Sequence, residues 1–199
     1  MKRMKLTTLI PVMALVAAGL GAEEYKIDGS HSKAQFAVKH LMVSNVRGEF
    51  GKMTGTVSFD AQNPGAIKID ATLDATTINT GITKRDDHLR GPDFFDTAKF
   101  PTLSFKSTSA KKTADGLVVT GELTMHGVTK VVVLNVEGPT AEIKDPWGNQ
   151  RLGATATAKI KRSDFGLNWN QAIEAGGVVV GDEIAITIDV EATRPGVKK

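Results

Sequence analysis

The chain has 199 residues, with 25 lysines and arginines, 22 aspartates and glutamates, and no cysteine, so it can form neither a disulfide nor a cysteine-linked lipid anchor. Three of the basic residues lie before position 6, which leaves 22 basic residues against 22 acidic ones in the rest of the chain. No stretch combines clustered Lys and Arg with aromatic residues, so nucleic acid is not an expected partner.

The N-terminus has the pattern of a secretory signal peptide. Three positive residues precede an apolar run from Leu6 to Leu20, and the small residues Gly21 and Ala22 follow. The interruption by Pro11 argues against a membrane-spanning helix, and no later segment approaches the roughly 18 apolar residues of a span. We therefore expect a signal peptide over 1–22, one domain over 23–199, no stable membrane insertion, and a periplasmic location.

Alternation of apolar and polar residues predicts β-strands through most of the mature chain. Besides the four strands whose apolar faces are given below, strands are expected near 24–39, 46–60, 102–109 and 129–138. Turns that contain Gly, Pro and Asn separate the strands. Eight strands with short connections predict an antiparallel sheet that closes into a barrel or pairs into a sandwich. The clearest apolar faces are Ile67, Ile69, Ala71, Leu73 and Ala75; Leu117, Val119, Gly121, Leu123 and Met125; Leu152, Ala154, Ala156, Ala158 and Ile160; and Ile184, Ile186, Ile188 and Val190.

Two segments break this rhythm. The first, Thr80–Pro101, is too long for a hairpin, and the spacing from Thr83 to Asp86 predicts a short helix with Thr83 as its cap. This helix and a turn at Pro92 are expected to cover one end of the barrel. The second, Arg162–Asp182, is rich in glycine and predicts a loose connection.

Small residues on the inward faces raise the question of a cavity. An eight-stranded barrel is either filled by its own side chains or holds one small ligand. The alternation alone leaves both readings open, because large neighbours could fill the space that small ones leave. The small inward residues are Ala71, Ala75, Gly121, Ala154, Ala156 and Ala158, and the large ones include Phe36, Phe59, Phe105 and Met125.

Catalytic and metal-binding motifs are weak. The histidines at 31, 40, 88 and 126 have no ligand spacing, so neither a metal site nor a cofactor is expected. The sequence Arg85-Asp86-Asp87-His88-Leu89 could serve acid/base chemistry or hold a polar head group, but a capped helix with local ion pairs has the same pattern. With no nucleophile motif, catalysis is the weaker hypothesis.

In the order and spacing of its short motifs, the mature chain resembles the YceI-like family of polyisoprenoid-binding or lipid-binding proteins. The motifs are Tyr25-Lys26-Ile27-Asp28 with His31-Ser32 and Phe36; Val38 to Leu41; Gly48-Glu49-Phe50; Thr80-Gly81; Arg85-Asp86 with His88-Leu89; Asp93-Phe94-Phe95-Asp96; Phe100-Pro101 with Phe105; Gly121-Glu122-Leu123-Thr124 with His126-Gly127; and Arg162-Ser163-Asp164-Phe165-Gly166-Leu167.

The resemblance implies a lipocalin-like, extended eight-stranded antiparallel β-barrel. Its pore would carry a long apolar lipid such as an isoprenoid, a quinone or its precursor, or a fatty acid or amide, and a homodimer stays open. The alternatives are an enzyme acting on a lipid head group, an exported stress-related protein that binds fatty acids or their amides, and an exported stress or interaction protein with a solid core. The resemblance guides two sets of expected ligand contacts. They are Phe36, Val38, Phe94, Phe95, Phe105, Met125, Phe165 and Trp169 for the tail, and His31, Arg85, Asp86, His88, Arg162 and Asp164 at a polar mouth.

Overall fold

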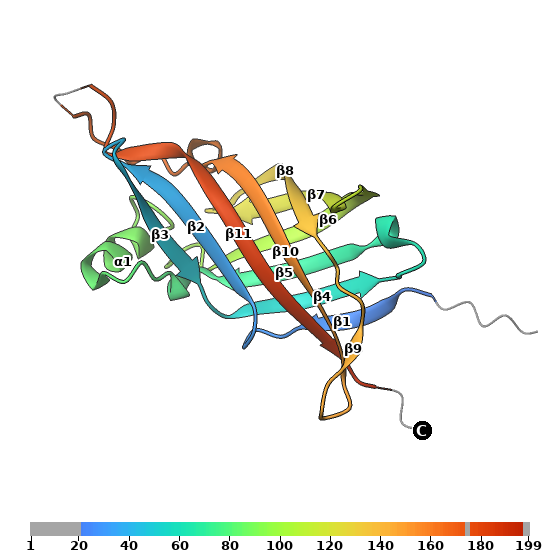
Figure 1. Cartoon of the computed structure of the whole chain (residues 1–199). Coiled ribbons are helices and arrows are strands. Elements are labelled where there is room, and N and C mark those ends of the chain that lie inside the picture. Colours follow the sequence, from blue (N-terminus) through green and yellow to red (C-terminus); the bar gives the residue numbers. More distant parts are fainter. Residues whose placement is uncertain (1–20, 174–175, 197–199) are drawn as a thin grey trace, which may run out of the picture.

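The computed structural model describes residues 21–173 and 176–196, and the predicted signal peptide lies outside these residues except for Gly21 and Ala22. Strands dominate the described residues, which also form one α-helix and three short 3₁₀ helices; Figure 1 shows the arrangement of the strands. The elements in chain order are β1 (Glu23–Ile27), β2 (Lys33–His40), β3 (Ser44–Phe50), β4 (Met53–Phe59), η1 (Pro64–Ala66), β5 (Lys68–Asp74), η2 (Ala75–Thr77), α1 (Thr83–Arg90), β6 (Thr102–Lys112), β7 (Gly116–Met125), β8 (Val128–Glu137), β9 (Ile143–Lys144), β10 (Gln150–Lys161), η3 (Arg162–Phe165) and β11 (Val180–Arg194).

The strands close into an antiparallel barrel. The ring runs β11-β1-β4-β5-β6-β7-β8-β10 and returns to β11, so eight strands complete it. β10 pairs with β11 from Gln150 to Lys161, whereas it pairs with β8 only from Thr155 to Thr157. The predicted eight-stranded antiparallel barrel is confirmed.

At two of the eight positions in the barrel the strand is interrupted: β1 and β2 share one position, and β3 and β4 share the next. The sequence pattern predicted each pair as a single strand. β2 and then β1 pair with successive parts of the same edge of β11. β3 pairs with β2 and β4 pairs with β1, so these two also follow one another along a common edge. The breaks fall in the turn at residues 28–32 and at Gly51-Lys52, which lie outside the strands.

The long connection after β5 forms the predicted helix with a different cap. α1 begins at Thr83, and Ile82, which cannot accept a hydrogen bond through its side chain, occupies the cap position. The Asp86 carboxylate does lie in the first turn, but it accepts hydrogen bonds from the backbone N–H and the hydroxyl of Thr80. The prediction that Thr83 caps the helix was therefore wrong. Asp86 instead forms hydrogen bonds to Thr80 in the preceding loop. Figure 1 shows α1 beside β3 at one end of the barrel.

Buried apolar side chains form two clusters along the inside of the barrel. One lies between β1, β4, β7, β8, β10 and β11 and includes Tyr25 and Val119. The other includes Phe50, Ile78 and Phe165 and lies toward α1 and η3. Within residues 21–173 and 176–196, no helix has the length and apolar character needed to cross a membrane.

Candidate ligand cavity

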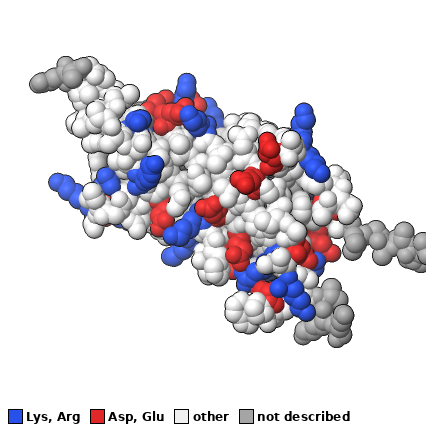
Figure 2. Space-filling model, in the orientation of Figure 1, with Lys and Arg blue, Asp and Glu red and all other residues white. Residues whose placement is uncertain are grey.

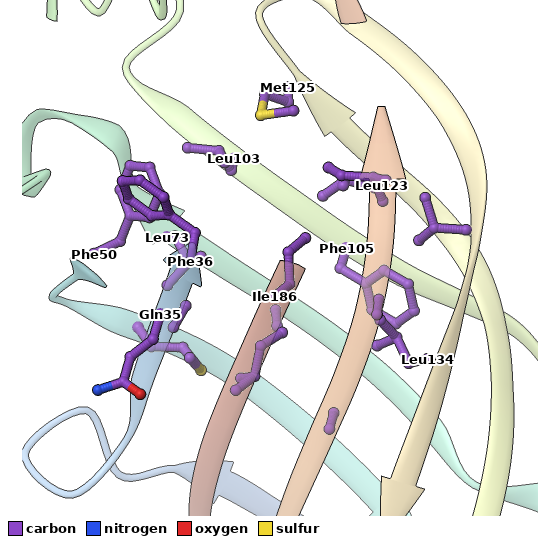
Figure 3. Close-up of a pocket in the computed structure, with 18 of the residues that line it drawn as sticks. Gln35, Phe36, Phe50, Leu73, Leu103, Phe105, Leu123, Met125, Leu134 and Ile186 are labelled. Carbon is purple, nitrogen blue, oxygen red and sulfur yellow. The ribbon is translucent and has the colours of Figure 1, made fainter. Parts of the chain in front are cut away.

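An apolar cavity of about 230 Å³ occupies the barrel interior. An engineered apolar cavity of about 150 Å³ in another protein already takes up benzene, so this space is large enough for part of a hydrocarbon chain. Side chains from both apolar clusters line it, from Pro139 and Leu152 at one end to Leu89 and Leu167 at the other. Figure 3 shows lining side chains converging from several strands.

Small residues on β5 and β10 make room for this cavity. Ala71, Ala154, Ala156 and Ala158 all line it, as their place on the alternating faces predicted. Because a methyl group reaches less far into the barrel than the Leu or Ile of a packed core, these positions leave space that neighbouring side chains do not fill.

Two other small residues leave no such space. Ala75 lies in η2 rather than in a strand and is 1% exposed within the apolar cluster near α1. At Gly121 an added Cβ would lie 2.4 Å from the ring of Phe105, so that ring already fills the position. At these two positions the filled alternative that the sequence left open is the one the structure adopts, and neither residue lines the cavity.

Six of the eight predicted tail contacts line the cavity: Phe36, Val38, Phe94, Phe95, Phe105 and Met125. Phe165 is 1% exposed and packs in the adjacent cluster, and Trp169 packs outside the lining. The Trp169 ring centroid lies 5.2 Å from that of Phe94 and 5.1 Å from that of His88. Trp169 therefore packs against Phe94, which lines the cavity, without lining it itself.

Arg162 is the charged side chain of the cavity wall among the residues described, and it is 6% exposed. Its guanidinium donates hydrogen bonds to three backbone carbonyls, those of Leu167, Val180 at 3.3 Å and Gly181 at 2.9 Å. Burial lowers the pKa of Arg162, and the charge of Asp182 opposes this shift. Arg162 thus joins η3 to the start of β11 and places one positive charge beside an apolar space.

The polar residues predicted on α1 are held by local contacts. Arg85 donates to the hydroxyl and the carbonyl of Thr80, and Asp86 is buried against the same residue. His88 Nε2 lies 2.9 Å from the Asp93 carboxylate. These contacts have the arrangement of a helix with local ion pairs, and they bring no side chain into position as a nucleophile.

The predicted polar mouth divides between two places. Asp164 lies exposed in η3, beside Arg162 and at the same end as α1. His31 lies between β1 and β2, away from that end, where its Nδ1 is 3.0 Å from Asp28. Placing His31 with the other five was wrong, because the break between β1 and β2 turns this segment toward the final residues of β11.

His31 belongs to an ionic cluster on the outer surface. Arg151 contacts Asp28 at 2.9 Å and Asp145 at 2.8 Å, and it also pairs with Glu191. Asp28, His31 and Glu191 present three potential metal ligand atoms within 4.8 Å, an arrangement that the fold assembles and the spacing did not reveal. The guanidinium of Arg151 already pairs with both carboxylates, so the geometry fits an ion-pair network that joins β10, β11 and the turn after β1.

This network should make stability depend on pH. Burial opposes ionisation of Asp145, but hydrogen bonds from Arg151 and Asn149 outweigh it and lower its pKa to about 2, from 3.8. A lowered folded-state pKa stabilises the fold above the unfolded pKa, and this contribution is lost as pH falls from about 4 toward 2. Urea unfolding should therefore show that Asp145→Asn is less stable than wild type near neutral pH and that the difference shrinks on acidification. Asp115→Asn, in the exposed β6–β7 turn, is the control; a difference that is the same at every pH would contradict the assignment.

Several lining residues were not predicted as ligand contacts. Leu89 comes from α1, and Leu167 follows η3. Phe50 and Met53 flank the interruption between β3 and β4 and also line the cavity. Phe50, Leu89 and Leu167 belong to the motifs of the resemblance, but alternation could not assign their direction, because each of the four residues lies at or near the end of an element.

The fold and the cavity together define a small antiparallel β-barrel with an apolar interior. The chain belongs to the YceI-like family, whose domain matches residues 25–192, which confirms the resemblance inferred from the sequence. Protein YceI of Escherichia coli O6:H1 is 41% identical over 169 residues, which cover 84% of this chain and 88% of the relative.

Solved structures share the architecture. The YCEI protein of Campylobacter jejuni is 34% identical, with a TM-score of 0.66 over 78% of this chain and 89% of that protein. A polyisoprenoid binding domain from Saccharophagus degradans, implicated in plant cell wall breakdown, has a TM-score of 0.63 at 19% identity and covers 86% of this chain and 98% of that domain. At this identity the second match supports the fold alone.

Proposed function

We propose that this protein binds the apolar tail of a long-chain lipid inside its barrel and carries that lipid without transforming it. The observation that supports the proposal is the cavity itself, whose lining is apolar except at Gln35, Ser104 and Arg162 among the residues described. An interior of this composition favours hydrocarbon and disfavours polar ligands, which would lose hydrogen bonds to water on entry. We infer an isoprenoid by analogy with a domain of the same fold that is described as polyisoprenoid binding, although the match itself carries only the fold.

The energetics are compatible with carriage. Each buried methylene contributes about 0.8 kcal/mol, so about ten of them contribute roughly 8 kcal/mol before the cost of ordering the chain. Such binding requires no precisely placed polar groups, and the affinity depends more on the length of the hydrocarbon chain than on its chemical identity. Arg162, at the end of the cavity near α1, is the group best placed to meet a polar head. The basic and apolar N-terminal sequence supports export, and therefore a role between membranes.

The direct test is to identify what the protein carries when it is isolated from cells. Protein purified without detergent should release an apolar lipid on solvent extraction, at a substantial fraction of one molecule per protein, and mass spectrometry should identify it. A cysteine-free protein of similar size, purified in the same way, controls for lipid carried over from membranes. Protein that is repeatedly empty and that binds neither added isoprenoid quinone nor fatty acid would contradict the proposal.

A further inference from the structure

The β2–β3 hairpin ends in three exposed apolar residues, Leu41, Met42 and Val43, which we call the apolar tip. They are 38%, 57% and 81% exposed. Leu41 and Met42 have φ angles of 51° and 63°, and large residues without a hydrogen-bonding side chain rarely adopt this left-handed conformation. Two successive residues with positive φ in a hairpin turn are normally Asn and Gly, so this sequence holds large apolar side chains in solvent at a conformational cost.

The apolar tip continues the wall of the cavity. In β2, Val38 lines the cavity two residues before His40, and His40 pairs with the lining residue Val180 of β11. The backbone N–H of Leu41 donates to Val179, directly beside that pair. The apolar residues Val38, Val179 and Val180 therefore lie between the barrel interior and the tip, with His40 beside them. Figure 1 shows the end of this hairpin beside the start of β11 at one end of the molecule.

The surroundings of the apolar tip are suited to hydrocarbon at its end and to head groups at its base. The N–H groups of Leu41 and Val43 are both bonded within the protein, so the turn can leave water without losing these hydrogen bonds. Lys39 and Arg47, on the flanking strands, have no acidic side chain within 4.0 Å among the described residues, unlike Lys33, which pairs with Glu49. Figure 2 shows basic and acidic residues side by side near this end of the molecule.

We propose that the apolar tip inserts into the surface of a lipid bilayer and that a lipid passes between bilayer and cavity at this end. The docking follows from the tip itself, whereas the passage of lipid rests on the proposed function. A bilayer is the occupant that provides hydrocarbon for the tip, anionic head groups for Lys39 and Arg47, and a source of long-chain lipid for the adjoining cavity.

The test compares two double variants of the full chain. Met42→Asp/Val43→Asp removes the apolar surface of the tip, and the fold should tolerate it because aspartate adopts positive φ more readily than methionine does. The matched control is Val131→Asp/Val133→Asp on β8, where the two valines are 68% and 50% exposed on the barrel wall. Three quantities are measured: flotation with vesicles of phosphatidylcholine and phosphatidylglycerol, the rate of transfer of a fluorescent fatty acid to those vesicles, and its equilibrium affinity without vesicles.

Wild type and the β8 control should float with the vesicles, whereas the tip variant should lose about tenfold or more in both vesicle binding and transfer rate. Its affinity for the fluorescent fatty acid should stay unchanged. Equal flotation of all three proteins would overturn the proposal, as would self-association of the wild type through the tip in sedimentation. If no protein binds the fatty acid but flotation still depends on the tip, docking stands and the proposed function fails.

Discussion

Replacing Ala156 with phenylalanine should abolish lipid binding and leave the barrel folded. Ala156 lies on β10 between two other alanines that line the cavity, and it is 8% exposed. A phenylalanine ring at this position would occupy the space in which a hydrocarbon chain would lie. We expect the affinity for a long-chain fatty acid or quinone, measured by fluorescence titration, to fall by about a hundredfold or more, because several buried methylenes lose their site.

The unfolding free energy of the same variant separates an open cavity from a packed core. If the space is open, the ring fills it and stability holds or rises; in a packed core the same change would cost about 1–3 kcal/mol. The matched control is Thr157→Phe, at the neighbouring exposed position on the outer face of β10, which should bind lipid as wild type does. Unchanged binding by the Ala156 variant would place the ligand outside the barrel.

Arg162→Ala should produce the largest loss of stability among the substitutions considered. The change leaves the carbonyls of Leu167, Val180 and Gly181 without their charged donor. Hydrogen bonds to charged groups contribute about 1.5–3 kcal/mol each, and water that enters the site replaces part of this. We therefore expect urea unfolding to show a loss of about 3 kcal/mol or more, together with faster hydrogen exchange at residues 180–181.

Two further variants test the cause of that loss. Arg162→Lys keeps the positive charge but cannot reach all three carbonyls with the planar geometry of a guanidinium, so its stability should lie between those of the alanine variant and wild type. Lys161→Ala removes a positive charge from the adjacent exposed position and should change stability little. If Arg162→Ala were within about 0.5 kcal/mol of wild type, the bridge from η3 to β11 would have no structural importance.

The barrel could be predicted from the sequence because alternation is a local property. On β10 every second residue from Leu152 to Ile160 was assigned inward, and all five line the cavity. The same pattern placed Ile184 and Ile188 of β11 on the inner face. For such strands the two faces of the sheet follow directly from the order of residues, without knowledge of the partners.

The remaining features depend on which strands become neighbours. The ring of Phe105 occupies the space beside Gly121 because the register between β6 and β7 pairs Phe105 with Leu123. His31 lies apart from the other predicted polar residues because the wall breaks after β1 and the chain turns toward Glu191. Neither the register between two strands nor the break between β1 and β2 changes the alternation of apolar and polar residues in the sequence. These parts of the candidate site could therefore be recognised only in the folded chain.

The unequal pairing of β10 makes the barrel wall mechanically asymmetric. On one side, its ladder to β11 runs without a break from Gln150 to Lys161. On the other side, its ladder to β8 covers only Thr155 to Thr157, and η3 contacts both strands. Because local opening is easiest where fewest hydrogen bonds must break, we expect the wall to open more readily between β10 and β8 than between β10 and β11. If a bulky ligand expanded the interior, we would therefore expect β8 and β10 to separate first, while the other strands keep their pairing.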